Sequence, residues 1–343
     1  MTAISRRRLG ALTAAGAFGA LVTACGSEEK PAADGGAKEP AKDGKEGAEG
    51  GAKIEIEDNH GKQSVPSPAK SVICTDNRSF EVLAAWDVKL SAAPKRLIPK
   101  TIEKYKNDDS ILDMGNHKEP DLEKVVEAKP DLIINGQRFR KRYDKLKELA
   151  PQAAIVEFDP RDGKPFDEEL KRQVTSLGTI FGKEDEAKKL VEEFEAAIER
   201  AKKAYKKEDT VMAVITSGGE IGYVAPSQGR ALGPVFDLLG MTPALKVEGA
   251  SKDHKGDDIS VEAIADSNPH WILVMDRDAA IAADKPEYKP AAKVIEESQA
   301  LTSVTAVSEG NIVYMPADTY TNESIQTYTE FFNSLADAFE AKA

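Results

Sequence analysis

Residues 184–207 carry a regular pattern of hydrophobic and polar positions. The apolar side chains recur at steps of three and four residues: Leu190, Val191, Phe194, Ile198, Ala201 and Tyr205. This is the period of one face of an α-helix. Acidic residues crowd its start and lysines its end, which suits the helix dipole. At ~1.5 Å per residue the helix would be about 36 Å long. Similar patterns lie on both sides of it, so we interpret it as a rigid link between two similar lobes.

Short apolar runs alternate with helical patterns on both sides of this helix. Before it, strands are expected at 72–74, near 88–92, and at 111–114, 131–135 and 153–158, after a small hairpin that starts near Lys53. Beyond it, strands are expected at 211–216, 221–225, 271–275 and 312–315, and a last helix at 323–339. This rhythm predicts an α/β protein whose two Rossmann-like lobes, 53–183 and 208–343, each have a central, mostly parallel sheet.

An internal repeat supports the two-lobe interpretation. The segment DLEKVVEAKPDLII at 121–134 matches SVEAIADSNPHWIL at 260–273. In both, a residue suited to the N-cap is followed two residues later by Glu123 or Glu262. A proline follows seven residues after that Glu, and an arginine fifteen residues after it, Arg138 or Arg277. A helix that is followed by a proline and then a strand can occur in any α/β protein. The equal spacing to two arginines nevertheless favours a true repeat.

Composition and charge narrow the possible functions. The chain has 343 residues, of which 41% are hydrophobic. This is enough for two domains with a sizeable core. The net charge is −12 at pH 7, which argues against nucleic acid as a partner.

Residues 1–24 are typical of an export signal. Ser5 and three arginines precede a mildly apolar stretch that ends in V-T-A-Cys25. The arginines resemble a twin-arginine signal, although Sec export remains open. The end resembles a bacterial lipobox, which implies that Cys25 is lipidated and anchors the protein on the extracytoplasmic face of the membrane.

Residues 25–52 lack aromatic and β-branched side chains after the cysteine. Such a segment buries too little apolar surface to offset its ordering entropy, so we expect a disordered tether. Cys74, the remaining cysteine, is interpreted as a buried thiol on a strand.

The folded part resembles a family of transport proteins. The blocks DLEKVVEAKPDLIIN and SVEAIADSNPHWILV are similar to those of the ATP-binding-cassette (ABC) importer substrate-binding proteins for iron siderophores and cobalamin. The resemblance implies two lobes joined by one long helix, a ligand cleft between them, a permease partner and a monomer without enzymatic activity or an intrinsic cofactor. The stretches INGQRFRKRYDKL, QGRALGPVFDLLG and VMDR are most similar to catecholate-siderophore binders.

The resemblance also implies which residues meet the ligand. Arg138, Arg230 and Arg277 stand where arginines face the siderophore, and His254 and Tyr320 stand where a His and a Tyr complete the iron coordination of a tetradentate ligand. The first stretch holds an extra residue, so Gln137 or Arg140 could take the role of Arg138. Arginine suits a bulky aromatic anion because its planar fork is always charged and stacks on rings. Imidazole and phenolate are both iron ligands.

Each candidate also has a plainer interpretation. Arg138 and Arg277 could be solvated loop residues, and Arg230 could only fix its loop. His254 could be a surface histidine, and Tyr320 a core or rim residue. Glu123 and Glu262 would dock into arginine pockets of the permease in the family, although a first-turn Glu also simply favours its helix dipole.

Three further functions remain open from the sequence. The same fold could bind haem, cobalamin or a ferric hydroxamate. An exported α/β enzyme is a second alternative, but the sequence holds no G-x-S-x-G elbow, no H-E-x-x-H, no P-loop and no His/Cys cluster with metal spacing. A surface adhesin is the third, and it would need no cleft lined with arginine.

Overall fold

The computed structural model describes residues 52–249, 251 and 253–343, which all belong to one compact unit, Gly50–Ala343. The predicted signal peptide, the lipobox with Cys25 and nearly all of the tether lie outside the described residues and stay predictions. Within the described ranges, no helix combines the length and the apolar character needed to cross a membrane.

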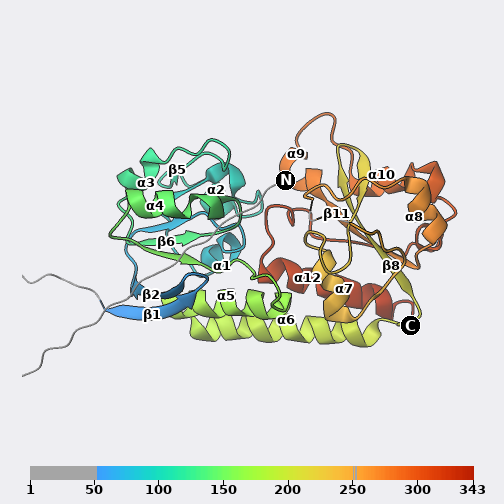
Figure 1. Cartoon of the computed structure of the whole chain (residues 1–343), viewed down its shortest axis with the longest axis horizontal. Coiled ribbons are helices and arrows are strands. Elements are labelled where there is room, and N and C mark those ends of the chain that lie inside the picture. The colour runs from blue at the N-terminus through green and yellow to red at the C-terminus, as the bar shows by residue number, and fades with distance from the viewer. Residues whose placement is uncertain (1–51, 250, 252) are drawn as a thin grey trace, which may run out of the picture. The chain divides into compact units, whose positions relative to one another are not determined.

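The N-terminal lobe is built on a parallel sheet of order β5-β4-β3-β6-β7. Its strands are β3 (Val72–Cys74), β4 (Ala92–Ala93), β5 (Leu112–Asp113), β6 (Leu132–Asn135) and β7 (Ala154–Glu157). Parallel neighbours require crossover connections, and helices supply most of them (Figure 1). An antiparallel hairpin of β1 (Lys53–Asp58) and β2 (Gly61–Pro66) precedes the sheet.

Both faces of this sheet are covered, because side chains of a strand point alternately to opposite sides. Val72 and Cys74 of β3 belong to the same buried cluster as residues of α1 (Phe80–Ala85) and α5 (Phe166–Phe181). Ile73, between them, belongs to a second cluster with residues of α3 (Glu123–Ala128) and α4 (Tyr143–Leu149). The three consecutive apolar residues therefore serve two separate helix layers, and Cys74 is a buried thiol as predicted.

The C-terminal lobe repeats this plan. Its strands are β8 (Thr210–Ser217), β9 (Glu220–Tyr223), β10 (Thr242–Pro243), β11 (Trp271–Asp276) and β12 (Ile312–Tyr314). The order β10-β8-β11-β12 is parallel, and β9 pairs antiparallel with β8. The sheet is again sandwiched, with α7 (Gly233–Leu239) on one side and α8 (Val261–Ser267) and α10 (Ala291–Glu296) on the other. The fold class predicted from the sequence is confirmed.

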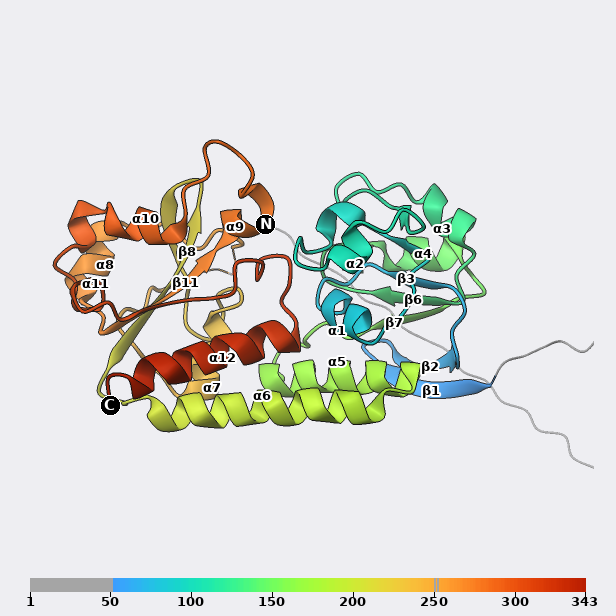
Figure 2. The same ribbon diagram turned by 180° about the vertical axis from the view of Figure 1, so that it is seen from behind.

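Three helices connect the lobes: α5, α6 (Glu184–Ala204) and α12 (Ile325–Glu340). Figure 2 shows α12 lying alongside α6, and the rings of Phe194 and Phe332 join them at a centroid distance of 5.9 Å. Residues of both sheets share one buried cluster with these helices. Close-packed interiors resist deformation, and α6 has no break, so we expect only small movements between the lobes.

The linking helix begins at Glu184 as predicted but ends at Ala204, before the predicted end at Lys207. Tyr205 takes an extended backbone conformation with φ −70° and ψ 132°. Its hydroxyl donates a hydrogen bond to the carbonyl of Asp209 and accepts one from the amide of Thr242. These contacts turn the chain into β8 and stop the helix.

The internal repeat is also a structural repeat. Helices α3 and α8 both end at a residue in the left-handed conformation, Lys129 with φ 45° and Asn268 with φ 39°. A proline follows each, and a buried parallel strand, β6 or β11, comes next. The two strands deliver Arg138 and Arg277 to equivalent positions.

Several elements differ from the sequence-based expectations. The strand expected near 88–92 shrinks to β4. A 3₁₀ turn, Gln137–Arg142, directly precedes α4. Short elements that the pattern did not predict are Lys95–Leu97, α2 (Glu103–Lys106), α9 (Arg277–Ala282), Gln299–Leu301 and α11 (Thr305–Ser308). Each is shorter than two helical turns, too short for periodicity to show.

We expect Phe194→Ala to lower the free energy of unfolding by about 3–5 kcal/mol, because truncating a buried phenylalanine leaves a cavity. Phe194 is fully buried between α6 and α12. Chemical denaturation followed by circular dichroism would measure the change.

Val126→Ala serves as the control for this substitution. The Val126 side chain lies on α3 and is 53% exposed. Its truncation should change stability by less than about 0.5 kcal/mol, as is usual for surface positions. Equal effects of the two substitutions would contradict a core shared through these helices.

Candidate ligand-binding site

The polar residues of the candidate site follow the carboxyl ends of parallel strands in both lobes. Residues 76–79 follow β3, Arg138 follows β6 and Asp159 follows β7. In the other lobe, Arg277 follows β11 and Tyr320 follows β12. Open α/β sheets bind ligands at this edge, so the topology alone brings these side chains toward one region.

Three guanidinium groups surround the ring of Tyr320. The guanidinium carbons of Arg230, Arg277 and Arg138 lie 4.3, 4.9 and 5.3 Å from the ring centroid. Arg138 and Arg230 also donate hydrogen bonds of 3.0 and 3.1 Å to the Tyr320 carbonyl. The tyrosine is 8% exposed. Four of the five ligand-binding residues predicted from the sequence are thus brought together, and we call this group the arginine–tyrosine platform.

Arg138 reaches the platform through an unusual turn after β6. A Cβ atom at Gly136 would lie 2.7 Å from Asp76 Oδ1, so the backbone passes where only glycine fits. Gln137 follows with φ 43°, and Arg138 Nη1 bonds to Asn77 Oδ1 and Gln137 Oε1, both at 2.9 Å. Arg140 is exposed. Of the alternatives left open by the sequence, the structure therefore places Arg138 at the tyrosine.

Arg277 is held from its own lobe. Its Nη1 donates to Ser217 Oγ at 3.1 Å and to Asp278 Oδ1 at 2.9 Å. Its Nε is buried and has no hydrogen-bond partner among the described residues. A buried donor without a partner is rare in folded proteins and calls for an explanation.

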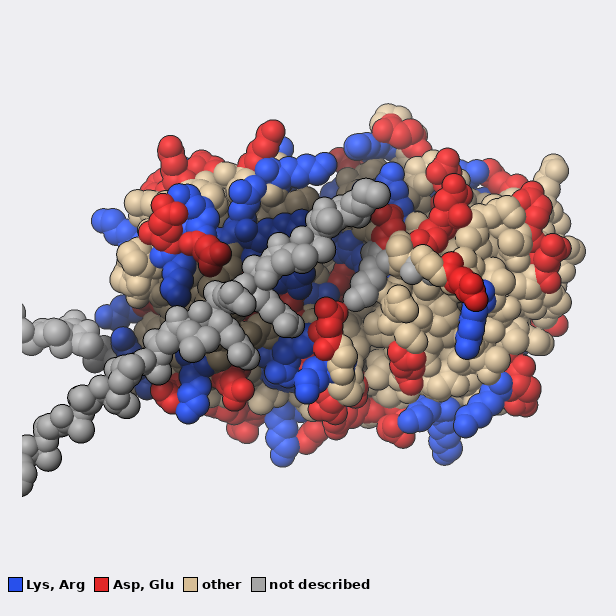
Figure 3. Space-filling model, viewed as in Figure 1, with Lys and Arg blue, Asp and Glu red and all other residues tan. Residues whose placement is uncertain are grey.

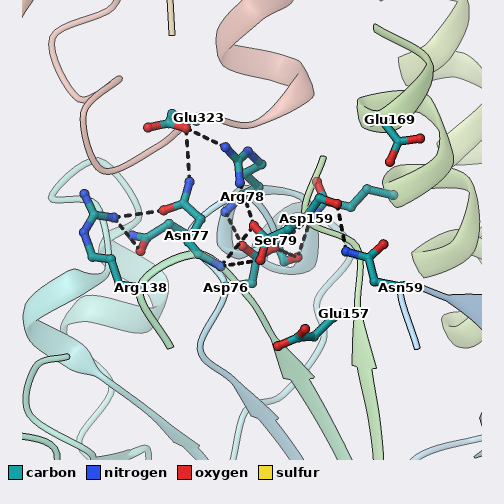
Figure 4. Close-up of polar contacts among 12 residues, drawn as sticks. Asn59, Asp76, Asn77, Arg78, Ser79, Arg138, Glu157, Asp159, Glu169 and Glu323 are labelled. Atoms are coloured by element: carbon teal, nitrogen blue, oxygen red, sulfur yellow. Dashed lines mark hydrogen bonds and ion pairs between the residues drawn. The ribbon is translucent and has the colours of Figure 1, made fainter. Parts of the chain in front are cut away.

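A second group, centred on Glu323, shares Arg230 with the platform. Figure 4 shows the contact between Glu323 and Arg78. Arg78 donates to Glu323 Oε2 at 2.7 Å and to Asp159 Oδ1 at 2.9 Å. Arg230 donates to Glu323 Oε1 through both Nε, at 2.8 Å, and Nη2. Gln137 Nε2 donates to Glu323 Oε2 at 3.2 Å. We call this group the Glu323 cluster. It joins a residue of the N-terminal lobe to one of the C-terminal lobe.

Sequence reasoning missed Arg78, Asp159 and Glu323. One signal was present: the polar run D-N-R-S at 76–79 follows the buried strand β3 directly, at the edge where α/β sheets bind ligands. The sequence around Asp159 and Glu323 carries no such signal, because acidic residues do not stand out in a chain of which 31% is charged.

The electrostatics of the site follow from burial and close charges. Burial raises the pKa of Glu323, but Arg230 and Arg78 outweigh it and lower the pKa to about 2. Burial also raises the pKa of Tyr320, and the hydrogen bond to Arg277 with the charges of the three arginines lowers it below its usual value. Burial and the charge of Asp159 raise the pKa of Asp76 to about 6, against the effect of Arg78. Glu323 is therefore ionised at neutral pH.

A cavity of about 640 Å³ adjoins the Glu323 cluster. Residues of both lobes line it, among them Arg78, Asp159, Phe166, Arg230 and Glu323. Its size is that of small-molecule sites. Figure 3 shows Lys and Arg side chains gathered in the recess between the lobes, although the protein as a whole is acidic.

Comparison with known proteins identifies the family. The model of the periplasmic binding protein family matches residues 72–319, the greater part of the chain. The chain belongs to this family. Its members are substrate-binding proteins, not enzymes, so the family predicted from the sequence is confirmed and the enzyme alternative is set aside.

Individual relatives support the family assignment. The petrobactin-binding protein YclQ of Bacillus subtilis is 29% identical over 281 residues, which cover 80% of this chain and 84% of that protein. The ferric-anguibactin-binding protein FatB of Vibrio anguillarum is 29% identical over 294 residues, 84% and 88% of the two chains. The crystal structure of YclQ has a TM-score of 0.71 at 27% identity, covering 84% of this chain and 99% of that one. The catecholate-siderophore binding protein VctP of Vibrio cholerae has a TM-score of 0.71 at 24% identity, with coverage of 84% and 100%, and shows the shared fold.

His254 forms no contact with the arginine–tyrosine platform among the described residues. It is an exposed residue of the loop before α8, and its Nδ1 is 3.6 Å from Asp253 Oδ2. None of the contacts among the described residues joins it to Tyr320. The described residues also hold no cluster of three or more His, Cys, Asp or Glu suited to a metal ion. The role of His254 as an iron ligand stays a prediction.

Glu123 and Glu262 occupy equivalent places in the two copies of the repeat. Each lies in the first turn of its helix, α3 or α8, and each is exposed. Neither carboxylate belongs to an ion pair of the described residues. Both are therefore accessible to a partner.

We expect Arg277→Gln to raise the pKa of Tyr320 toward its usual value, because the substitution removes a positive charge and a hydrogen bond that favour the phenolate. A pH titration of phenolate absorbance would measure it, with Tyr320→Phe identifying the contribution of this residue. Arg140→Gln, at an exposed arginine, is the matched control and should leave the titration unchanged. An identical titration of Arg277→Gln and the unaltered protein would contradict the platform.

Proposed function

We propose that this protein is the extracytoplasmic receptor of an ABC importer and that it captures a ferric siderophore of the catecholate type. The arrangement of Arg138, Arg230 and Arg277 around Tyr320 carries the proposal. Relatives named for petrobactin and ferric anguibactin, and the similar crystal structure of the petrobactin-binding protein, support it.

The chemistry of the platform suits a ferric catecholate. Such a complex is a bulky anion with exposed aromatic rings and phenolate oxygens. Guanidinium groups do not titrate in the physiological range, pair with oxygen anions and stack on ring faces. Together, the platform arginines create a local positive potential in an acidic protein. The buried Nε of Arg277 supplies a further donor.

Tyr320 and His254 are proposed as protein ligands of the iron when the siderophore leaves coordination positions free. The lowered pKa of Tyr320 supports this role, because the phenolate is the form that binds iron. His254 would come from the exposed loop of the C-terminal lobe. Iron here is cargo, brought by the siderophore.

The proposed receptor is a monomer attached to the membrane through lipidated Cys25, with residues 26–52 as the tether. Exposed Glu123 and Glu262, one on each lobe, are proposed to dock on the permease. Two equivalent carboxylates on two rigidly connected lobes would fix the orientation of the receptor on its partner.

We expect Arg138→Gln and Arg277→Gln each to weaken binding of a ferric bis-catecholate by about thirtyfold or more, the loss of ~2 kcal/mol typical of a buried charged contact. Fluorescence quenching of the chain from Gly26 onward would measure it. Arg200→Gln, whose side chain makes exposed ion pairs on α6, is the matched control and should bind normally.

The same titration with a ferric trihydroxamate, haem and cobalamin tests the assignment of the ligand, with iron-free ligands as controls. Tighter binding of any of these than of the catecholate would contradict the catecholate proposal. If neither the ferric catecholate nor any of these three ligands binds, the receptor proposal itself is contradicted.

We expect Glu123→Arg and Glu262→Arg to abolish most siderophore-dependent iron uptake while leaving siderophore binding unchanged, because both side chains are exposed in the first turn of their helices and neither forms an ion pair with a described residue of the platform. Uptake of labelled iron by cells would be compared with binding by the purified variants. Glu127→Arg, at another exposed glutamate of α3, is the control. Normal uptake by the double variant would rule out docking through these residues.

A further inference from the structure

Glu323 is an unexpected residue for a site that receives an anion. It lies between Tyr320 and α12, directly before Ser324, whose Oγ caps that helix by accepting a hydrogen bond from the amide of Thr327. Its side chain is buried. The sequence therefore fixes a negative charge beside Arg230, one of the three guanidiniums that the ligand would use.

Both oxygens of this carboxylate are engaged. Oε1 accepts from Nε and Nη2 of Arg230, and Oε2 accepts from Arg78 and Gln137. Two N–H groups of the Arg230 fork are thus directed at Glu323. Arg138, in contrast, bonds to uncharged oxygens of Asn77, Gln137 and Tyr320.

An anionic ligand oxygen that approaches these Arg230 groups must share them with a buried carboxylate. Like charges repel strongly in a site with little water. The repulsion grows with the negative charge on the ligand, whereas an uncharged complex does not experience it. Glu323 therefore weakens the binding of a highly charged complex more than that of an uncharged complex of similar size.

We propose that Glu323 sets the charge of the ferric complex that the site accepts and disfavours complexes of high negative charge. The inference rests on the proposed function and deepens it. Three catecholate dianions around Fe³⁺ give a trianion, two give a monoanion, and three hydroxamates give an uncharged complex. The favoured ligand is then a ferric complex with a net charge less negative than −3, such as a bis-catecholate without further anionic donors.

The test is a series of complexes graded by charge. Binding of the ferric complexes of a tris-catecholate, a bis-catecholate and a trihydroxamate would be measured for the chain from Gly26 onward, which holds the whole compact unit. The variants are Glu323→Gln and the matched control Glu330→Gln, which removes the same charge from an exposed position of α12.

We expect Glu323→Gln to tighten binding of the tris-catecholate by about tenfold relative to the control, to tighten the bis-catecholate less, and to change the uncharged complex by less than about twofold. The gain for the trianion should shrink at high salt. Equal weakening of all three complexes would show that Glu323 only holds the lobes together and would overturn the proposal, as would no change.

Two further measurements keep the test decisive. Glu323→Asp retains the charge and should retain the order of preference, even if the loss of contacts to Arg78 and Arg230 destabilises Glu323→Gln. Without any siderophore, Glu323→Gln should lower the pKa of Tyr320 further, and an unchanged titration would contradict the electrostatic coupling. Failure of the unaltered protein to bind catecholates would refute the proposed ligand. The pH titration of Tyr320 would then still test the electrostatic effect of Glu323.

Discussion

The structure of the site depends on compensating buried guanidinium charge. Moving an ion from water into a protein interior costs several kcal/mol, and ion pairing offsets this only with good geometry. Arg78 is held between Asp159 and Glu323, and Arg230 is aligned by Glu323. Arg138 is positioned by uncharged oxygens and by the ring of Tyr320, whereas Arg277 has Asp278 of its own lobe as a charged partner. The acidic residues of the cluster are thus what allows so much arginine to be buried in one place.

The repeat explains how a site of this kind arises from two lobes. Each copy ends its helix at a left-handed residue before proline, enters a buried strand and releases an arginine at the carboxyl end. The two arginines, one from each lobe, approach the ring of one tyrosine. Tyr320 belongs to the connection that leads into α12, so the helix that ties the lobes together also supplies the ring between them.

The sequence predicted the large elements and part of the site. The long helix, the two parallel sheets and the repeat follow from strong periodicity, and Arg138 and Arg277 follow from the equal spacing of the repeat. Arg230 and Tyr320 came only through the family resemblance. Arg78 and Glu323 were missed because their pairing joins residues 245 positions apart. Gly136 was missed because a close backbone approach leaves no pattern.

The buried cluster that runs from β3 through α5, α6 and α12 to β8 has a consequence for folding. Neither lobe has a complete hydrophobic core of its own, because each lobe packs on helices that also pack against the other lobe. A fragment cut after α5 would expose the apolar face of α5 that packs against α6 in the whole chain. The lobes should therefore acquire their structure together, and neither half should be protected from aggregation or proteolysis until the entire folded part of the chain is present.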